Sequence, residues 1–122
     1  MFHIFNSQEE RREYGGSAFI EIQFCRLPRD TSLSEIVDVD SIENWMNDSL
    51  YADDENEFYR EYSRIFDCGT YNNKESGIVD IFGINYYAPS QIERLLSRIH
   101  KEKPADYEVL AQWLECAKQY KG

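Results

Sequence analysis

The sequence predicts a single α+β domain over residues 1–122, in which a small, mostly antiparallel sheet carries helices on one face and the chain ends in a helical hairpin. Three observations lead to this class. Apolar and polar residues alternate over 17–25, as in a strand with one buried face. Segment 78–87 is apolar at nearly every position, as in a strand covered on both faces. Two stripes of apolar residues at helical spacing follow it, on either side of Pro104.

The N-terminal part of the chain is expected to hold two strands. Residues 1–6 form a short apolar strand, and a polar stretch over 7–13 leads to a turn at the glycine pair 15–16. The even-numbered residues of 17–25 are apolar, so one face of this second strand should be buried. Pro28 ends the strand because proline cannot donate a hydrogen bond to the ladder.

Two helical segments are expected next. Ser32 and Glu35 have the spacing of a capping box, which predicts a helical turn near 33–38. The same spacing at 40–43 predicts a helix over about 41–51. The apolar stripe of that helix would consist of Ile42, Trp45, Met46 and Leu50.

A further helix is expected to begin at the acidic residues 53–55, because negative charge is favoured at the positive end of the helix dipole. Its buried face would consist of Phe58, Tyr62, Ile65 and Phe66. Its outer face would carry Glu57, Arg60, Glu61 and Arg64, which are spaced for ion pairing within the helix.

The C-terminal half begins with a polar turn region over 68–77, with room for a further strand near 67–72. The apolar strand 78–87 should lie in the centre of the sheet. A third capping box, at 90–93, predicts a helix whose buried stripe consists of Ile92, Leu95, Leu96 and Ile99. The stripe of the last helix would consist of Tyr107, Leu110, Ala111, Leu114 and Ala117, widened by Val109, Trp113, Cys116 and Tyr120.

The net charge of −10 is concentrated in about a quarter of the chain. Residues 35–67 contain eleven acids and two bases, whereas 1–34 contain five acids and four bases and 68–122 contain seven of each. Such a one-sided field attracts and orients a cationic partner. It disfavours direct binding to nucleic acid or to an anionic membrane, which proteins contact through Lys and Arg. The expected partner is therefore a basic protein.

The acidic segment also carries aromatic residues, and interfaces combine aromatic anchors with charges that steer the partner. The expected partner-binding residues are Tyr51, Asp53, Asp54, Glu55, Glu57, Tyr59 and Glu61. Trp45 and Tyr62 lie on apolar helix stripes, so we expect them in the core instead.

No catalytic residue, metal ligand or cofactor site is expected from the motifs. Cys25, Cys68 and Cys116 are odd in number and widely spaced, which favours buried thiols over disulfides. Neither His3 nor His100 stands at metal-ligand spacing from a cysteine. The acidic segment lacks the glycine and glutamate that an EF-hand calcium loop requires, and the glycines match no nucleotide-binding loop.

Asp80 is the one carboxylate within the apolar strand 78–87. An unpaired buried carboxylate costs several kcal/mol or becomes protonated, so Asp80 is expected to pair with a base or to lie at the end of the sheet. The expected location of the protein is the cytosol. No stretch approaches the ~20 apolar residues of a membrane span, and residues 1–5 lack the basic start of a signal peptide.

The chain resembles the small, acidic, cytosolic immunity proteins that bacteria encode beside polymorphic toxins, including those of contact-dependent growth inhibition. The resemblance extends over the whole chain in size, charge and α+β pattern, and its local feature is 16–20, Gly-Ser-Ala-Phe-Ile, leading into a strand. It implies a protein that binds one cognate toxin domain, often a basic nuclease, and covers the active site or a nearby surface.

Two other classes of function stay open. One is a DNA-mimicking regulator or inhibitor, whose carboxylates imitate phosphates and which would bind several DNA-binding proteins. The other is a small enzyme that works through Asp80 or through a Cys–His pair.

Overall fold

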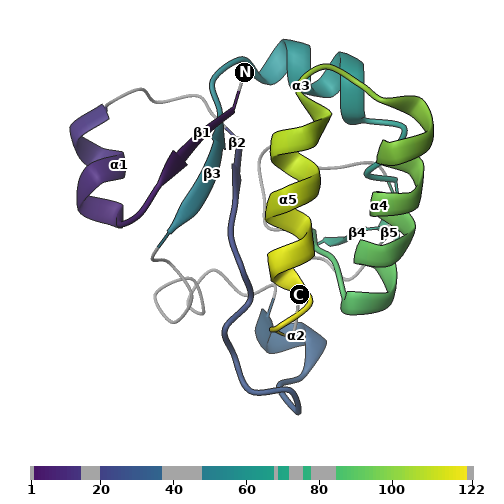
Figure 1. Cartoon of the computed structure of the whole chain (residues 1–122). Helices are drawn as coiled ribbons and strands as arrows, with labels where there is room; N and C mark the ends of the chain where they lie inside the picture. Colours follow the sequence, from purple (N-terminus) through teal and green to yellow (C-terminus); the bar gives the residue numbers. More distant parts are fainter. Residues whose placement is uncertain are drawn as a thin grey trace.

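The computed structural model describes residues 2–14, 20–36, 48–67, 69–71, 76–77 and 85–120, with the side chains of Glu55, 69–71 and 76–77 left out. This part of the chain forms an α+β domain (Figure 1). In chain order its elements are β1 (Phe2–Phe5), α1 (Gln8–Tyr14), β2 (Ile20–Ile22), α2 (Leu33–Ile36), β3 (Ser49–Ala52), α3 (Glu55–Tyr62), β4 (Gly69–Tyr71), β5 (Ser76–Gly77), β6 (Asn85–Tyr86), α4 (Pro89–Glu102) and α5 (Tyr107–Ala117).

The described strands form two small antiparallel sheets. The first has the order β1-β3-β2, and Tyr51 of β3 lies opposite both His3 and Glu21. The second has the order β5-β4-β6. The further strand expected near 67–72 is present as β4. The apolar strand expected over 78–87 is seen at β6, which pairs with β4 alone among the described strands, and Asp80 lies outside the described residues.

The expected helix over 41–51 is wrong at its C-terminal end, because 49–52 form the central strand β3. Residues 41–47, with Trp45, lie outside the described part. Every residue of β3 is buried, and Leu50 is fully enclosed between its two neighbouring strands and the helices. The pairing partners are distant in sequence, so a local helical pattern could not report them. Tertiary pairing therefore overrides the local preference.

The helix α1 was not expected, although the sequence carries a signal for it. The Glu10 amide donates to Ser7 Oγ over 3.2 Å, as in a capping box, and the Glu10 carboxylate accepts from the Asn6 amide, one residue before Ser7, over 3.0 Å. The Arg11 amide closes the first turn by donating to the Ser7 carbonyl over 3.1 Å. A serine followed three residues later by a glutamate is the sequence pattern that predicts this helix start.

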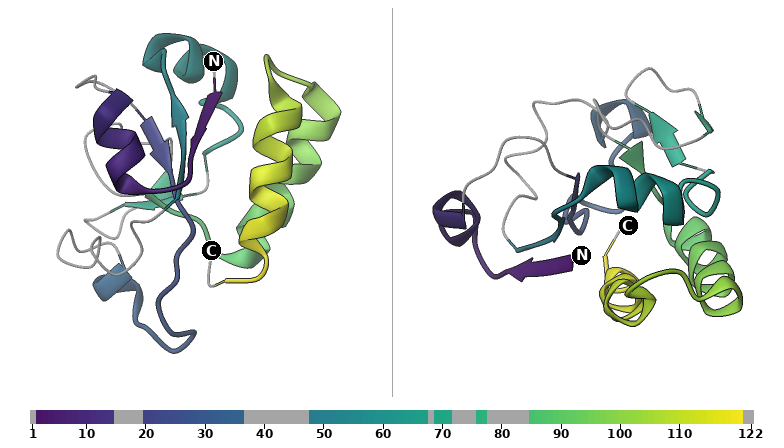
Figure 2. Two further views of the ribbon diagram at one scale, coloured as in Figure 1. Left: turned by 60° about the vertical axis from the view of Figure 1, so that its left-hand side comes forward. Right: turned by 90° about the horizontal axis from the view of Figure 1, so that it is seen from above.

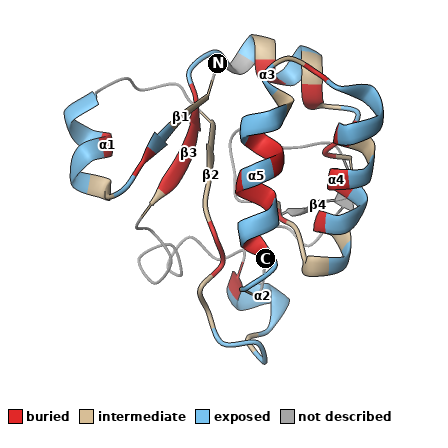
Figure 3. Cartoon of the chain, viewed as in Figure 1, coloured by how far each residue is buried: buried red, intermediate tan, exposed pale blue. Residues whose placement is uncertain are grey.

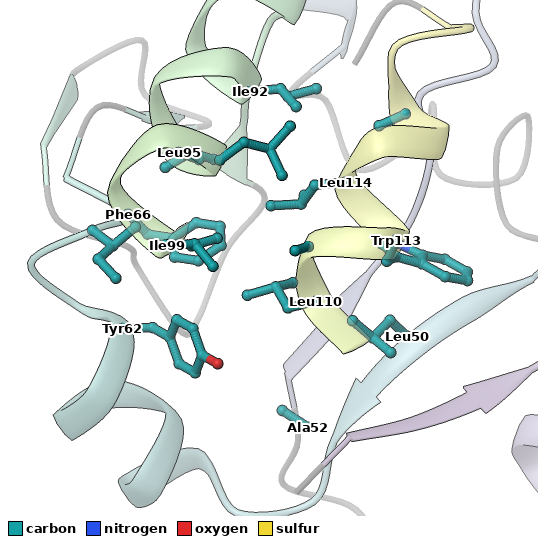
Figure 4. Close-up of a cluster of buried hydrophobic side chains, with 14 of the residues drawn as sticks. Leu50, Ala52, Tyr62, Phe66, Ile92, Leu95, Ile99, Leu110, Trp113 and Leu114 are labelled. Atoms are coloured by element: carbon teal, nitrogen blue, oxygen red, sulfur yellow. The ribbon is translucent and has the colours of Figure 1, made fainter. Parts of the chain in front are cut away.

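The helical hairpin expected at the C-terminus is present as α4 and α5, and it supplies much of the core (Figures 3 and 4). The expected buried stripe of α4 is confirmed, since Ile92, Leu95, Leu96 and Ile99 are all at most 4% exposed. The expected capping box at 90–93 is wrong, because the helix begins earlier, at Pro89, after an Ala88 cap. The Ala88 amide donates to Gln91 Oε1 over 2.8 Å. Proline suits this first position, where an amide hydrogen has no partner in the helix.

The helices α3, α4 and α5 lie on one side of the first sheet, and α1 lies on the other side (Figure 2). On the helical side, Leu50 and Ala52 of β3 meet α5, with Trp113 next to Leu50 (Figure 4). The four residues expected on the buried face of the third helix, Phe58, Tyr62, Ile65 and Phe66, are all buried, but α3 ends at Tyr62 and the last two lie in the turn that follows. Cys116 was expected in the core but is exposed, because the stripe of α5 is narrower than the sequence suggested.

Candidate interaction surface

The helix α3 begins where the acidic residues predict. Asp54 is its N-cap: Asp54 Oδ1 accepts a hydrogen bond from the Glu57 amide over 3.0 Å, and the Asp54 carbonyl accepts one from the Phe58 amide over 3.0 Å. The carboxylate therefore faces the positive end of the helix dipole. This geometry confirms the expectation that 53–55 open a helix.

Most of the expected partner-binding residues lie at the solvent side of this helix. The Asp53 side chain is 38% exposed, Asp54 is exposed, and Tyr59 is 40% exposed. Glu57 and Glu61 are half-buried. Glu55 occupies the first turn of α3. Asp53 and Asp54 precede the helix, Glu57 and Glu61 lie one turn apart on one face of it, and Tyr59 lies on another face. We call these residues together the α3 surface.

Tyr51 does not belong to the α3 surface. It is only 4% exposed, because it stands in the middle of β3 on the side that faces α1. Its ring lies 5.7 Å from that of Phe5 and 5.4 Å from that of Tyr14. The Arg11 guanidinium lies 4.8 Å from its centroid. Tyr59 is therefore the exposed aromatic of the expected set.

Sequence reasoning missed that Asp106, far along the chain, joins this surface. Asp106 and the half-buried Glu57 and Glu61 all raise the pKa of Tyr62, although burial of the phenol is the largest cause. The Tyr62 hydroxyl donates a hydrogen bond to the Ala105 carbonyl, which fixes the turn between α4 and α5 against α3. No local pattern marks Asp106 as a neighbour of α3, so only the tertiary fold adds this acid.

The acids that the structure describes in segment 35–67 do not form one patch. Asp48 pairs with Arg26, and Asp67 pairs with Arg98 over 2.8 Å. Asp48 and Asp53 lie just outside opposite ends of β3. Five residues of extended strand separate them, which corresponds to about 17 Å. Asp48 and Asp67 are thus acids of this segment that bases from elsewhere neutralise.

Asp53 makes a contact with β1 that the sequence did not reveal. Its Oδ2 lies 3.0 Å from His3 Nε2, and both side chains are about two-fifths exposed. The His3 ring also lies 5.3 Å from that of Tyr14, on the side of the sheet that α1 covers. The contact places the start of the α3 surface directly beside the first strand.

A second, buried ion pair holds α1 against the sheet. Arg11 is 5% exposed, and its Nε donates to Glu21 Oε1 over 2.7 Å. Gln23 Nε2 donates to the other oxygen of Glu21 over 3.0 Å. Because both charges are taken out of water and satisfied, this pair is a structural element. Neither residue stood out in the sequence.

Among the described residues, those considered for catalysis lie in separate parts of the fold. Cys25 is buried next to Tyr86 and Ile36, and burial is the main cause that raises the pKa of Tyr86 to about 12. His100 packs against the Tyr107 ring at 6.3 Å. Cys68 and Asp80 lie outside the described residues. Within the described ranges, no group of three or more His, Cys, Asp or Glu side chains is placed to hold a metal ion.

Comparisons with protein-family models, with curated proteins and with solved structures find no match to this chain. A search of the described helices for a segment long and apolar enough to cross a bilayer finds none. The geometry of the surface is therefore the basis for assigning a function.

Proposed function

We propose that this chain is a cytoplasmic immunity protein that binds a cationic toxin domain, such as a basic nuclease, and neutralises it through the α3 surface. The observation that carries the proposal is the gathering of acids from two elements around Tyr62. Glu57 and Glu61 of α3 and Asp106 of the turn between α4 and α5 all act on the Tyr62 hydroxyl, which donates a hydrogen bond to the neighbouring Ala105 carbonyl. Asp53 extends this group to the edge of the first sheet.

The bases near α3 do not cancel these acids. Arg64 is turned toward α4, where its Nε donates to Glu102 Oε1 over 2.8 Å. Arg60 is exposed, and it is the one base of the sequence 53–63, which contains five acids at 53, 54, 55, 57 and 61. A nuclease is basic where it holds phosphate, so a surface of this sign accelerates association and occupies the phosphate-binding site. Tyr59 supplies an exposed aromatic ring of the kind that anchors interfaces.

The test uses co-expression with the protein encoded by the adjacent open reading frame, because the resemblance implies that toxin and immunity genes lie side by side. The variant is Glu57→Lys and Glu61→Lys together, which leaves intact the Asp54 cap and the contact of Asp53 with His3. The matched control is Glu35→Lys and Glu108→Lys, which changes the net charge equally on exposed positions of other helices.

We expect the α3 variant to associate at least about tenfold more slowly and to lose protection, while the control variant protects like the wild type. Circular dichroism checks that both variants fold. Protection that survives in the α3 variant would show that this surface is not the contact. Binding to several unrelated DNA-binding proteins, in competition with DNA, would instead identify a DNA mimic.

A further inference from the structure

The strand β1 forms an outer edge of the first sheet. It pairs with β3, and no described helix or strand lies along its other side (Figures 1 and 2). The backbone amides and carbonyls on the outer side of an edge strand are a template for another strand. The helix α1 follows β1 but lies over the face of the sheet, where Arg11 and Tyr14 contact Tyr51.

This edge lacks the usual protection. Proteins guard exposed edges with prolines, charged side chains or bulges, whereas β1 reads Phe-His-Ile-Phe and pairs in unbroken register from Phe2 to Phe5. Ile4 is 52% exposed, the highest value among the large hydrophobic side chains of the described residues. A strand added beside β1 would cover Ile4 and continue the sheet.

Carboxylates stand at both ends of the same edge. At one end, Asp53 Oδ2 lies 3.0 Å from His3 Nε2. At the other end, Glu10 Oε2 accepts from the Asn6 amide over 3.0 Å. Both belong to the side of the sheet that α1 covers. The neighbouring base Arg11 is buried and paired with Glu21, so it does not offset them.

These charges indicate which of two partners can pair with the outer edge of β1, a second copy of the chain or a basic strand of another protein. A second copy of the chain, paired antiparallel through β1, would bring the Asp53 end of one copy toward the Glu10 end of the other, and like charges would repel. A strand with basic residues near both ends would instead match them. We propose that β1 is a docking edge for an extended segment of a cationic protein partner, which adds a strand to the first sheet with its basic side chains near Asp53 and Glu10.

This inference rests on the proposed function, because it gives the cationic partner a specific mode of contact. The spacing of the partner's bases follows from the strand. His3 and Asn6 are about 10 Å apart along β1, so lysines four residues apart, about 13 Å, reach both carboxylates from one face. The peptide Thr-Lys-Val-Thr-Val-Lys-Thr has this spacing, and its valines fall on the face of Ile4.

The experiment is an NMR titration of the labelled full chain with this peptide. We expect shift changes concentrated at residues 2–6 and at Tyr14, with contacts between the backbone of the peptide and that of β1. Ile4→Lys should weaken binding about tenfold, because it places a charge on the edge. Leu33→Lys is the matched control, since Leu33 is 41% exposed on α2, and should bind like the wild type. A peptide with glutamates in place of the lysines should not bind.

The inference is overturned if the peptide causes no change at 2–6 at millimolar concentration, if Ile4→Lys binds as well as the wild type, or if both peptides bind equally. Concentration-dependent dimers of the free chain that Ile4→Lys abolishes would show a second copy as the occupant and would also overturn it. None of these outcomes bears on the charge-reversal test of the α3 surface, so the two proposals fail separately.

Discussion

The buried pair of Arg11 and Glu21 gives the sharpest prediction about stability. Arg11→Met keeps most of the volume of the side chain and removes its charge, which leaves the largely buried Glu21 carboxylate with the hydrogen bond from the Gln23 amide. The two side chains are 6% and 15% exposed, so little water reaches Glu21 to replace the lost guanidinium. The substitution also removes the cation from the Tyr51 ring, 4.8 Å away.

The expected loss follows from these contacts. Removing one partner of a buried pair costs about 3–5 kcal/mol, because the other charge is left uncompensated. The hydrogen bond from Gln23 still satisfies part of Glu21, so the loss should lie at the lower end of this range. We expect the free energy of unfolding to fall by about 3 kcal/mol. With an m-value of about 1.5 kcal/mol per molar urea, the midpoint should fall by about 2 M.

The chain offers a matched control for this measurement. Arg64 Nε bonds Glu102 Oε1 over 2.8 Å, nearly the same geometry, but the two side chains are 64% and 32% exposed. Arg64→Met should therefore cost less than about 1 kcal/mol. The double variant Arg11→Met with Glu21→Gln should recover part of the loss, because it removes the orphaned charge. Equal midpoints for Arg11→Met and Arg64→Met would refute the reasoning that burial sets the cost.

Three further predictions concern the core, the helix cap and the phenols. Leu95→Ala should lower the free energy of unfolding by about 3 kcal/mol in urea titrations, because Leu95 is fully buried. Asp54→Ala should cost about 1 kcal/mol in the same assay, against less than about 0.5 kcal/mol for the exposed Asn56→Ala, because only Asp54 caps α3. Burial raises the pKa of Tyr62, and that of Tyr86 to about 12, above the ordinary value of 10.0. The native state then keeps protons that the unfolded state loses, so stability should fall as pH rises from about 10 to about 12, and less steeply in Tyr62→Phe.

Local sequence patterns predicted those elements whose residues are close in the chain. The acids at 53–55 predicted the start of α3, because capping and the helix dipole act within one turn. The spacing of Ile92, Leu95, Leu96 and Ile99 predicted the buried face of α4 for the same reason. Ser7 and Glu10 carry an equally local signal, so the start of α1 was also predictable from the sequence.

The candidate surface was predicted in part. The sequence located Asp53, Asp54, Glu57 and Tyr59 near the solvent side of one helix, because the acids are consecutive in the chain. It misplaced Tyr51, whose burial depends on Arg11 and Tyr14 packing over it from α1. Aromatic residues serve both in cores and at interfaces, and composition alone does not separate these two uses.

The sequence by itself determined the α+β class, the helical hairpin and the sign of the charge, since each depends on composition or on contacts within a few residues. Only the tertiary structure decided that 49–52 is the central strand, that Asp106 joins the acids of α3, and that Arg26 and Arg98 neutralise Asp48 and Asp67. These outcomes depend on which distant segments meet, and the free energy of such pairing has no local periodicity from which it can be read.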